Sequence, residues 1–159
     1  MKKVMLFVGV LALLLPGCGT DERERLIADA LDQINSAATN MATIRDNIVK
    51  WEKAKESERP KLLKSAIDGT QALSKNALAF QLIKGQADKL EPGTLESRKE
   101  LADKYRERFA AAIENANKER IALNEAIARA EKKEKAPLVD LKISLQKAQG
   151  DFENLVKQR

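Results

Sequence analysis

The sequence predicts an all-α protein, folded as an antiparallel bundle of three or four amphipathic helices. From residue 20 onward the chain is rich in Ala, Leu, Glu, Lys, Arg and Gln, which lose little conformational entropy in a helix. Apolar residues recur at spacings of three and four, the periodicity of a helix with one buried face. Three of the four prolines, at positions 60, 92 and 137, divide this pattern into segments.

We expect the first helix to span residues 20–58. Thr20 is the expected N-cap, and acidic residues follow it in the first turn, where they suit the positive end of the helix dipole. Trp51 falls on the apolar stripe, so we expect a core side chain, with an anchor for a partner interface as the alternative. The stripe consists of Ile27, Ala30, Ile34, Ala37, Met41, Ile44, Ile48 and Trp51.

The second helix is expected at 60–90 and ends at the clearest turn in the chain, Glu91-Pro92-Gly93-Thr94. Proline ends a helix, glycine permits a tight turn, and Thr94 is the expected cap of the next helix. The third segment, 94–134, and the fourth, 137–158, carry the same amphipathic spacing.

Pro60 and Pro137 can each be a turn or a kink, because both lie in strongly helical surroundings. Two turns give a four-helix bundle. Two kinks give one long α-hairpin, whose arms would each reach roughly 100 Å at 1.5 Å per residue. The apolar faces are wider than the narrow seam of a two-stranded coil, so we favour the bundle.

The first residues have the anatomy of an export signal. Lys2 and Lys3 precede an apolar run of twelve residues, 4–15. This run is shorter than the roughly 20 residues that a membrane-spanning helix needs. The motif that follows resembles the lipobox of bacterial lipoproteins at Leu15, Gly17 and Cys18, with Pro16 where that family usually has Ala, Ser or Thr.

The resemblance implies that residues 1–17 are a removed signal peptide and that Cys18, the only cysteine, carries the lipid that holds the protein on a membrane. Residues 18–25 are then a short charged tether or helix start, and 26–159 form a single helical domain. By the same analogy, Gly19 favours the periplasmic face of the outer membrane, since an aspartate at this position commonly retains lipoproteins in the inner membrane.

Charge excludes a nucleic-acid binder. After removal of the signal, 27 basic side chains face 24 acidic ones, and segments divided at the prolines carry only −2 to +2. The densest basic cluster is Lys132, Lys133 and Lys135, interrupted by Glu131 and Glu134. We expect a solvated helix face there; the alternative is a contact with anionic lipid headgroups or cell-wall polymer.

The sequence indicates no catalytic, metal or cofactor residues. It has no histidine, no serine in a nucleophile motif and no glycine-rich phosphate loop. We therefore expect a non-enzymatic, lipid-anchored lipoprotein that binds or scaffolds a protein partner in the cell envelope, with no small-molecule substrate. The alternatives are a periplasmic chaperone or pilot protein with an apolar groove, and an enzyme whose carboxylates meet inside the bundle.

A structural lipoprotein of the murein type is also similar in its general features, since that family combines a lipidated cysteine with an Ala-rich heptad helix. Members of that family end in a lysine that is joined to peptidoglycan. This sequence ends Lys157-Gln158-Arg159. The similarity therefore does not imply covalent attachment to the cell wall.

Overall fold

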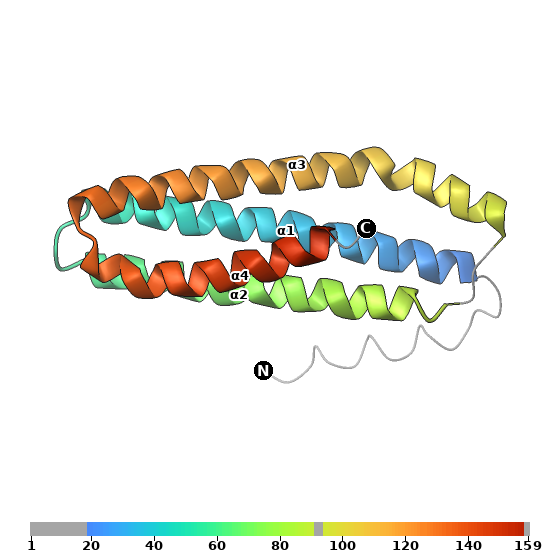
Figure 1. Ribbon diagram of the computed structural model, residues 1–159, viewed down its shortest axis with the longest axis horizontal. Coiled ribbons are helices and arrows are strands. Elements are labelled where there is room, and N and C mark those ends of the chain that lie inside the picture. Colours follow the sequence, from blue (N-terminus) through green and yellow to red (C-terminus); the bar gives the residue numbers. More distant parts are fainter. Residues whose placement is uncertain (1–18, 91–93, 158–159) are drawn as a thin grey trace, which may run out of the picture.

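The protein is an elongated four-helix bundle. The computed structural model describes residues 19–90 and 94–157, and all four long helices run along one axis (Figure 1). They are α1 (Gly19–Lys53), α2 (Arg59–Ala87), α3 (Leu95–Lys133) and α4 (Val139–Lys157), with a single 3₁₀ turn, η2 (Ala136–Leu138), before α4. The described residues contain no strand. The predicted all-α bundle is confirmed.

Both ambiguous prolines lie at turns. Pro60 is the second residue of α2, and Pro137 lies in the 3₁₀ turn that opens α4. Proline is tolerated in the first turn of a helix because its missing N–H would have no partner inside the helix there. The long-hairpin alternative is therefore wrong. The first helix also ends at Lys53, five residues before the predicted end, and residues 54–58 form the turn into α2.

Of the two predicted N-caps, Thr94 is confirmed and Thr20 is wrong. Thr94 is the N-cap of α3, where the Ser97 amide donates a hydrogen bond to Thr94 Oγ1 at 3.2 Å. The prediction of Thr20 as the N-cap of α1 is wrong, because Gly19 is already helical. Residues 21–25, expected as a tether or helix start, are a continuous part of α1.

The core lies between Leu26 and Phe152 and draws on all four helices. In α1, six of the eight predicted stripe residues are at most 2% exposed, from Ile34 to Trp51. The backbones of α1 and α2, α1 and α3, and α2 and α4 approach closely. The α3–α4 pair is instead joined by polar side chains, such as the Gln149 amide, which donates to Asn124 Oδ1 at 3.3 Å.

The helices differ in length in a way that divides the bundle into two ends. α3 has 39 residues and α4 only 19, so α4 accompanies the other helices along part of their length (Figure 1). At one end lie the start of α1, the end of α2 and the start of α3. At the opposite end lie the α1–α2 and α3–α4 turns.

Candidate functional site

The most distinctive surface is the end of the bundle that holds the two turns. We define the basic end as residues 50–64, around the α1–α2 turn, together with 129–142, around the α3–α4 turn. These two segments contain eleven Lys and Arg and six Asp and Glu, a net charge of +5. The rest of the chain from residue 19 onward has a net charge of −2, so the basic end holds all of the excess positive charge.

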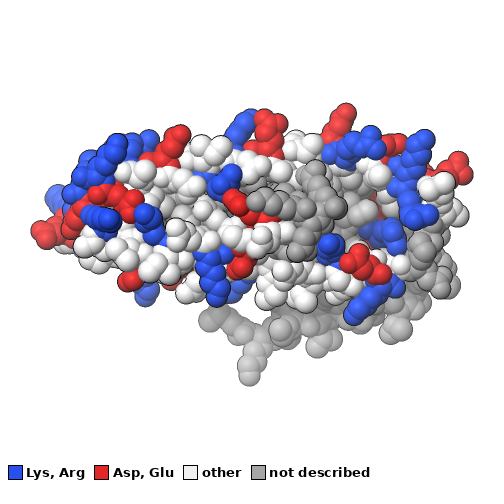
Figure 2. Space-filling view, viewed as in Figure 1, with Lys and Arg blue, Asp and Glu red and all other residues white. Residues whose placement is uncertain are grey.

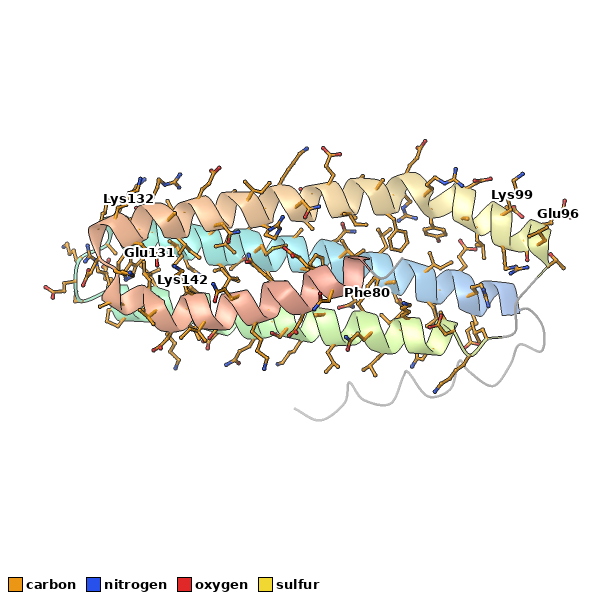
Figure 3. The ribbon with its side chains drawn as sticks, in the orientation of Figure 1. Phe80, Glu96, Lys99, Glu131, Lys132 and Lys142 are labelled. Atoms are coloured by element: carbon orange, nitrogen blue, oxygen red, sulfur yellow. The ribbon has the colours of Figure 1, made fainter. Side chains whose placement is uncertain are left out.

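Three ion pairs hold the basic end together. Arg59 Nη1 lies 2.9 Å from Glu134 Oε2 and links α2 to the end of α3. The other two pairs are Lys142 with Glu131, at 2.8 Å across the α3–α4 gap (Figure 3), and Lys133 with Glu52, at 3.7 Å. These pairs use three cations and three acids.

Eight cations at the basic end remain exposed and form no ion pair. Only three acids there, Glu56, Glu58 and Asp140, are likewise exposed and unpaired, so the uncompensated charge is still +5. Figure 2 shows Lys and Arg gathered at this end, with both signs mixed along the rest of the visible face. The eight cations are Lys50, Lys53, Lys55, Lys61, Lys64, Arg129, Lys132 and Lys135.

Trp51 is buried beneath the basic end. Its side chain is 2% exposed, and the Arg59 guanidinium carbon lies 5.0 Å from the centre of the indole ring. A cation over an indole contributes roughly 0.5–2 kcal/mol, more when it is removed from water. Arg59 therefore joins α1, α2 and α3 at one point. The ring has no free face, so Trp51 packs the core and is not exposed as an interface anchor.

The comparisons with known proteins give no family for this chain. It matches no protein-family model, no curated protein and no solved structure. The function must be inferred from the residues.

The opposite end of the bundle uses its charges to dock α1. Glu24 Oε1 accepts hydrogen bonds from Lys104 Nζ at 2.5 Å and from Tyr105 Oη at 2.9 Å. The Lys104 hydrogen bond is the main cause that lowers the pKa of Glu24, and Tyr105 adds to it; Glu24 in turn raises the pKa of Lys104. Arg23 Nη2 donates to the Leu90 carbonyl at 3.2 Å. The side chains of Arg23 and Glu24 thus hold the start of α1 against the turn after α2 and against α3.

The predicted lipid-attachment motif, Leu15, Gly17 and Cys18, lies outside the described residues. The first described residue, Gly19, directly follows Cys18 and begins α1. Within the described ranges, no helix combines the length and apolar character needed to cross a bilayer.

Two shallow hollows lie away from the basic end's tip. One, of about 340 Å³, follows the α3–α4 gap and is lined partly by Asn124, Gln149 and the Lys142–Glu131 pair. The other, of about 410 Å³, lies near the start of α1 and is mostly apolar. Its lining residues are Ile27, Ala102, Arg106, Phe109 and Ala110.

Among the described residues, the interior offers little for catalysis. Thr70 is the only Ser, Thr, amide or charged side chain buried among the residues that the structure describes, and its hydroxyl donates to the Ile67 carbonyl at 2.7 Å. No three metal-ligating side chains gather within the described ranges. The surface pairs that the sequence spacing suggests, Glu52 with Lys55 and Glu96 with Lys99, do not form among the described residues. Glu52 instead lies 3.7 Å from Lys133, and Glu114 pairs with Lys118 at 2.8 Å on the surface of α3.

Sequence reasoning found the Lys132, Lys133 and Lys135 cluster but missed the basic end as a whole. Pro60 and Pro137 lie within the two basic stretches, so segments divided at the prolines place the lysines of each stretch in two different segments. A window centred on each proline would have shown the excess of lysine.

Proposed function

We propose that this chain is a lipoprotein of the bacterial cell envelope, held by lipid on Cys18 at the periplasmic face of the outer membrane. It acts by binding and not by catalysis. In this proposal the bundle is a rigid spacer that presents the basic end to a partner at a fixed distance from the membrane.

The course of α1 is the observation that carries the proposal. This helix begins at Gly19, one residue after the expected lipid site, and continues without a break for 35 residues to the basic end. At 1.5 Å per residue it spans about 52 Å. The core begins at Leu26, only about 12 Å along the helix. A lipid at Cys18 would therefore hold one end of the bundle at the bilayer and the basic end far from it.

The contacts of Arg23 and Glu24 support a stiff connection. A flexible tether would let the bundle lie in any orientation and would make its length irrelevant. Here Glu24 binds α3 and Arg23 binds the turn that follows α2, so the residues after Gly19 move with the bundle. The mainly apolar interior, with Thr70 as the buried polar residue among those described, favours a binding role over one based on buried catalytic acids.

Lipidation and orientation can be tested with one set of variants. The lipid consumes the thiol of Cys18, the only cysteine, so a new cysteine becomes the single free thiol for a dye. We would introduce it by Lys99→Cys or, as the matched position, by Lys132→Cys. Both lysines are exposed on α3, near opposite ends (Figure 3). The two positions are 33 residues apart in the sequence, which corresponds to about 50 Å of helix.

In phosphatidylcholine membranes that contain a lipid-borne quencher and no anionic lipid, we expect strong quenching of the dye at position 99 and little at position 132. Equal quenching at both positions would contradict the spacer. Intact-mass analysis of the membrane-extracted parent should show acyl chains on an N-terminal Cys18, and the Cys18→Ser variant should leave the membrane fraction. A free thiol at Cys18 in the membrane-extracted protein would contradict the lipid anchor.

A second candidate function is client binding by a chaperone-type lipoprotein, which the apolar hollow at Ile27 and Phe109 favours. Ala110 lines this hollow, whereas Ala111 is exposed and does not. If the hollow holds clients, the parent should suppress the aggregation of a denatured test protein, and Ala110→Glu should abolish the effect while Ala111→Glu preserves it. Equal activity in both variants would exclude the hollow as a client site.

A further inference from the structure

We propose that the basic end binds the surface of an anionic phospholipid bilayer. The binding itself depends only on the residues of the basic end. A second step rests on the proposed lipid anchor on Cys18. Together, the anchor and the basic end would make the protein a bridge between two membranes. Acyl chains would hold one membrane, and the basic end would hold a second membrane that faces it.

The chemistry of the eight unpaired cations favours a diffuse anionic surface. Seven of them are lysines and only Arg129 is an arginine. Lysine presents a hydrated point charge on a flexible stem, whereas arginine suits the bidentate recognition of a single carboxylate or phosphate. Arg59, the arginine best placed for such recognition, is already engaged by Trp51 and Glu134. The described hollows do not include any of the eight cations. The basic end is therefore suited to a surface that carries many negative charges and not to one small ligand.

The placement of the eight cations favours binding to a flat bilayer surface over binding to a single polymer strand. They are spread over three helices and both turns at the bundle's blunt end: two on α1, two on α2, two on α3 and one in each turn. The end is about two helix diameters wide, roughly 20–24 Å. A flat bilayer can bring most of these cations within one Debye length, about 8 Å at physiological salt. A polymer strand would reach only those along its path.

The charge distribution along the bundle favours an end-on approach. The described middle segments, 31–49, 65–81, 105–128 and 143–157, contain eight basic and nine acidic residues, a net charge of −1. The described segments at the opposite end, 19–30, 82–90 and 94–104, contain seven basic and eight acidic residues, also −1. An anionic surface therefore attracts the basic end and weakly repels the flanks and the opposite end. Val139, 44% exposed at the basic end, adds an apolar contact at the headgroup level.

The first experiment measures sedimentation of residues 19–159 with vesicles. This chain contains the whole core, Leu26 to Phe152, so it can fold without the signal segment. We expect binding to vesicles of phosphatidylglycerol and phosphatidylcholine, none to pure phosphatidylcholine, and release at high salt, since the Debye length falls from about 10 Å at 0.1 M to about 3 Å at 1 M. No binding to the anionic vesicles at 0.1 M salt would overturn the proposal.

Two triple variants with the same overall charge separate the effect of the basic end on binding from the effect of net charge. The end variant carries Lys53→Glu, Lys61→Glu and Lys132→Glu. The control carries Lys75→Glu, Lys99→Glu and Lys147→Glu, which replace exposed, unpaired lysines elsewhere. Both change the net charge of residues 19–159 from +3 to −3. We expect the end variant to lose binding by about tenfold or more and the control to lose much less. Equal losses would overturn the assignment to the basic end. Circular dichroism checks that both variants are folded.

The second experiment tests the bridge. A chain that starts at Cys18 is coupled through this thiol to neutral vesicles that contain a maleimide lipid, and anionic vesicles are then added. Clustering of the two vesicle populations, lost in the end variant and kept in the control, would support the bridge. Binding without clustering would overturn it.

A third measurement, sedimentation with purified peptidoglycan, tests the competing partner. If the parent sediments with peptidoglycan, the end variant does not, and neither binds anionic vesicles, the basic end is a cell-wall site and the lipid assignment is wrong. If anionic vesicles bind and peptidoglycan does not, the lipid assignment stands. The vesicle experiments on residues 19–159 do not depend on acylation. A failure of the Cys18 anchor therefore remains distinguishable from a failure of this inference.

Discussion

Replacing Gly69 by alanine is the sharpest test of how α1 and α2 pack. A Cβ added at this position would lie 2.6 Å from Ile44 Cγ1 and 3.4 Å from its Cδ1. Non-bonded carbons prefer about 3.5–4.0 Å, so one of the groups must move by about 1 Å. Ile44 is completely buried, so its side chain has no free space into which to rotate. The helices can approach this closely because residue 69 has no side chain.

Two opposing effects set the size of the change. Alanine gains about 0.8–1.0 kcal/mol over glycine from helix propensity. Overpacking a filled core costs about 1–3 kcal/mol. We expect Gly69→Ala to lower the free energy of unfolding by about 1–2 kcal/mol, because the close contact is with a fully buried side chain. Gly85 is the matched control in the same helix, where an added Cβ meets no atom within 4 Å. Gly85→Ala should stabilise the protein by about 0.5–1 kcal/mol.

Urea unfolding followed by circular dichroism measures both variants, and a double-mutant cycle identifies the contact. Ile44→Ala removes Cγ1 and should cost about 2–5 kcal/mol on its own. In that background the added methyl at position 69 enters the vacated space, so Gly69→Ala should be neutral or stabilising. If Gly69→Ala stabilises the parent chain as much as Gly85→Ala does, α1 and α2 are not in close contact at Gly69, and the reasoning fails.

Four further predictions concern charge and capping. The pKa of Glu24 is lowered in the folded protein. Its contribution to stability is therefore complete above the ordinary carboxyl value of 4.5 and is lost as pH falls through the lowered value. Glu24→Gln should reduce this loss of stability at acid pH, measured by urea unfolding. The pKa of Lys104 is raised, so its contribution to stability is complete below the ordinary value of 10.5 and is lost as pH rises through the raised value. Lys104→Met should remove this loss of stability at alkaline pH. Arg59→Met should cost about 1 kcal/mol and change the emission of the single tryptophan, whereas Lys61→Met should do neither. Thr94→Ala should cost about 1 kcal/mol in urea unfolding and Thr94→Ser much less, and equal losses would mean that the hydroxyl is not a cap.

The helices and most of the core could be predicted because their signal is local. The spacing from Ile34 to Trp51 repeats along one helix, and every member of that series is buried. Helix ends were harder to place. Residues 54–58 contain strong helix formers, yet they form the turn that lets Arg59 reach Trp51 and Glu134. Packing between the helices places the turn here, and the sequence of residues 54–58 carries no signal for that packing.

The basic end could not be predicted as a unit because its parts are distant in the chain. Lys61 and Lys132 are 71 residues apart in the sequence and share one end of the bundle only because both prolines form turns. The residues around Pro60 and Pro137 allow either a turn or a kink, and only the width of the apolar faces favours turns. The ion pairs there, from Glu52 to Lys133 and from Arg59 to Glu134, likewise join residues 75 or more positions apart.

The two ends of the bundle use their charges in different ways. At the end where α1 starts, Glu24 binds α3 and Arg23 binds the turn after α2, so removing them should weaken the fold. At the basic end, eight cations are exposed and unpaired, and none contributes to the core. Their mutual repulsion opposes folding, and the three ion pairs beneath them only limit it. Stability therefore does not explain why the lysines gather there, whereas an anionic partner for this end does.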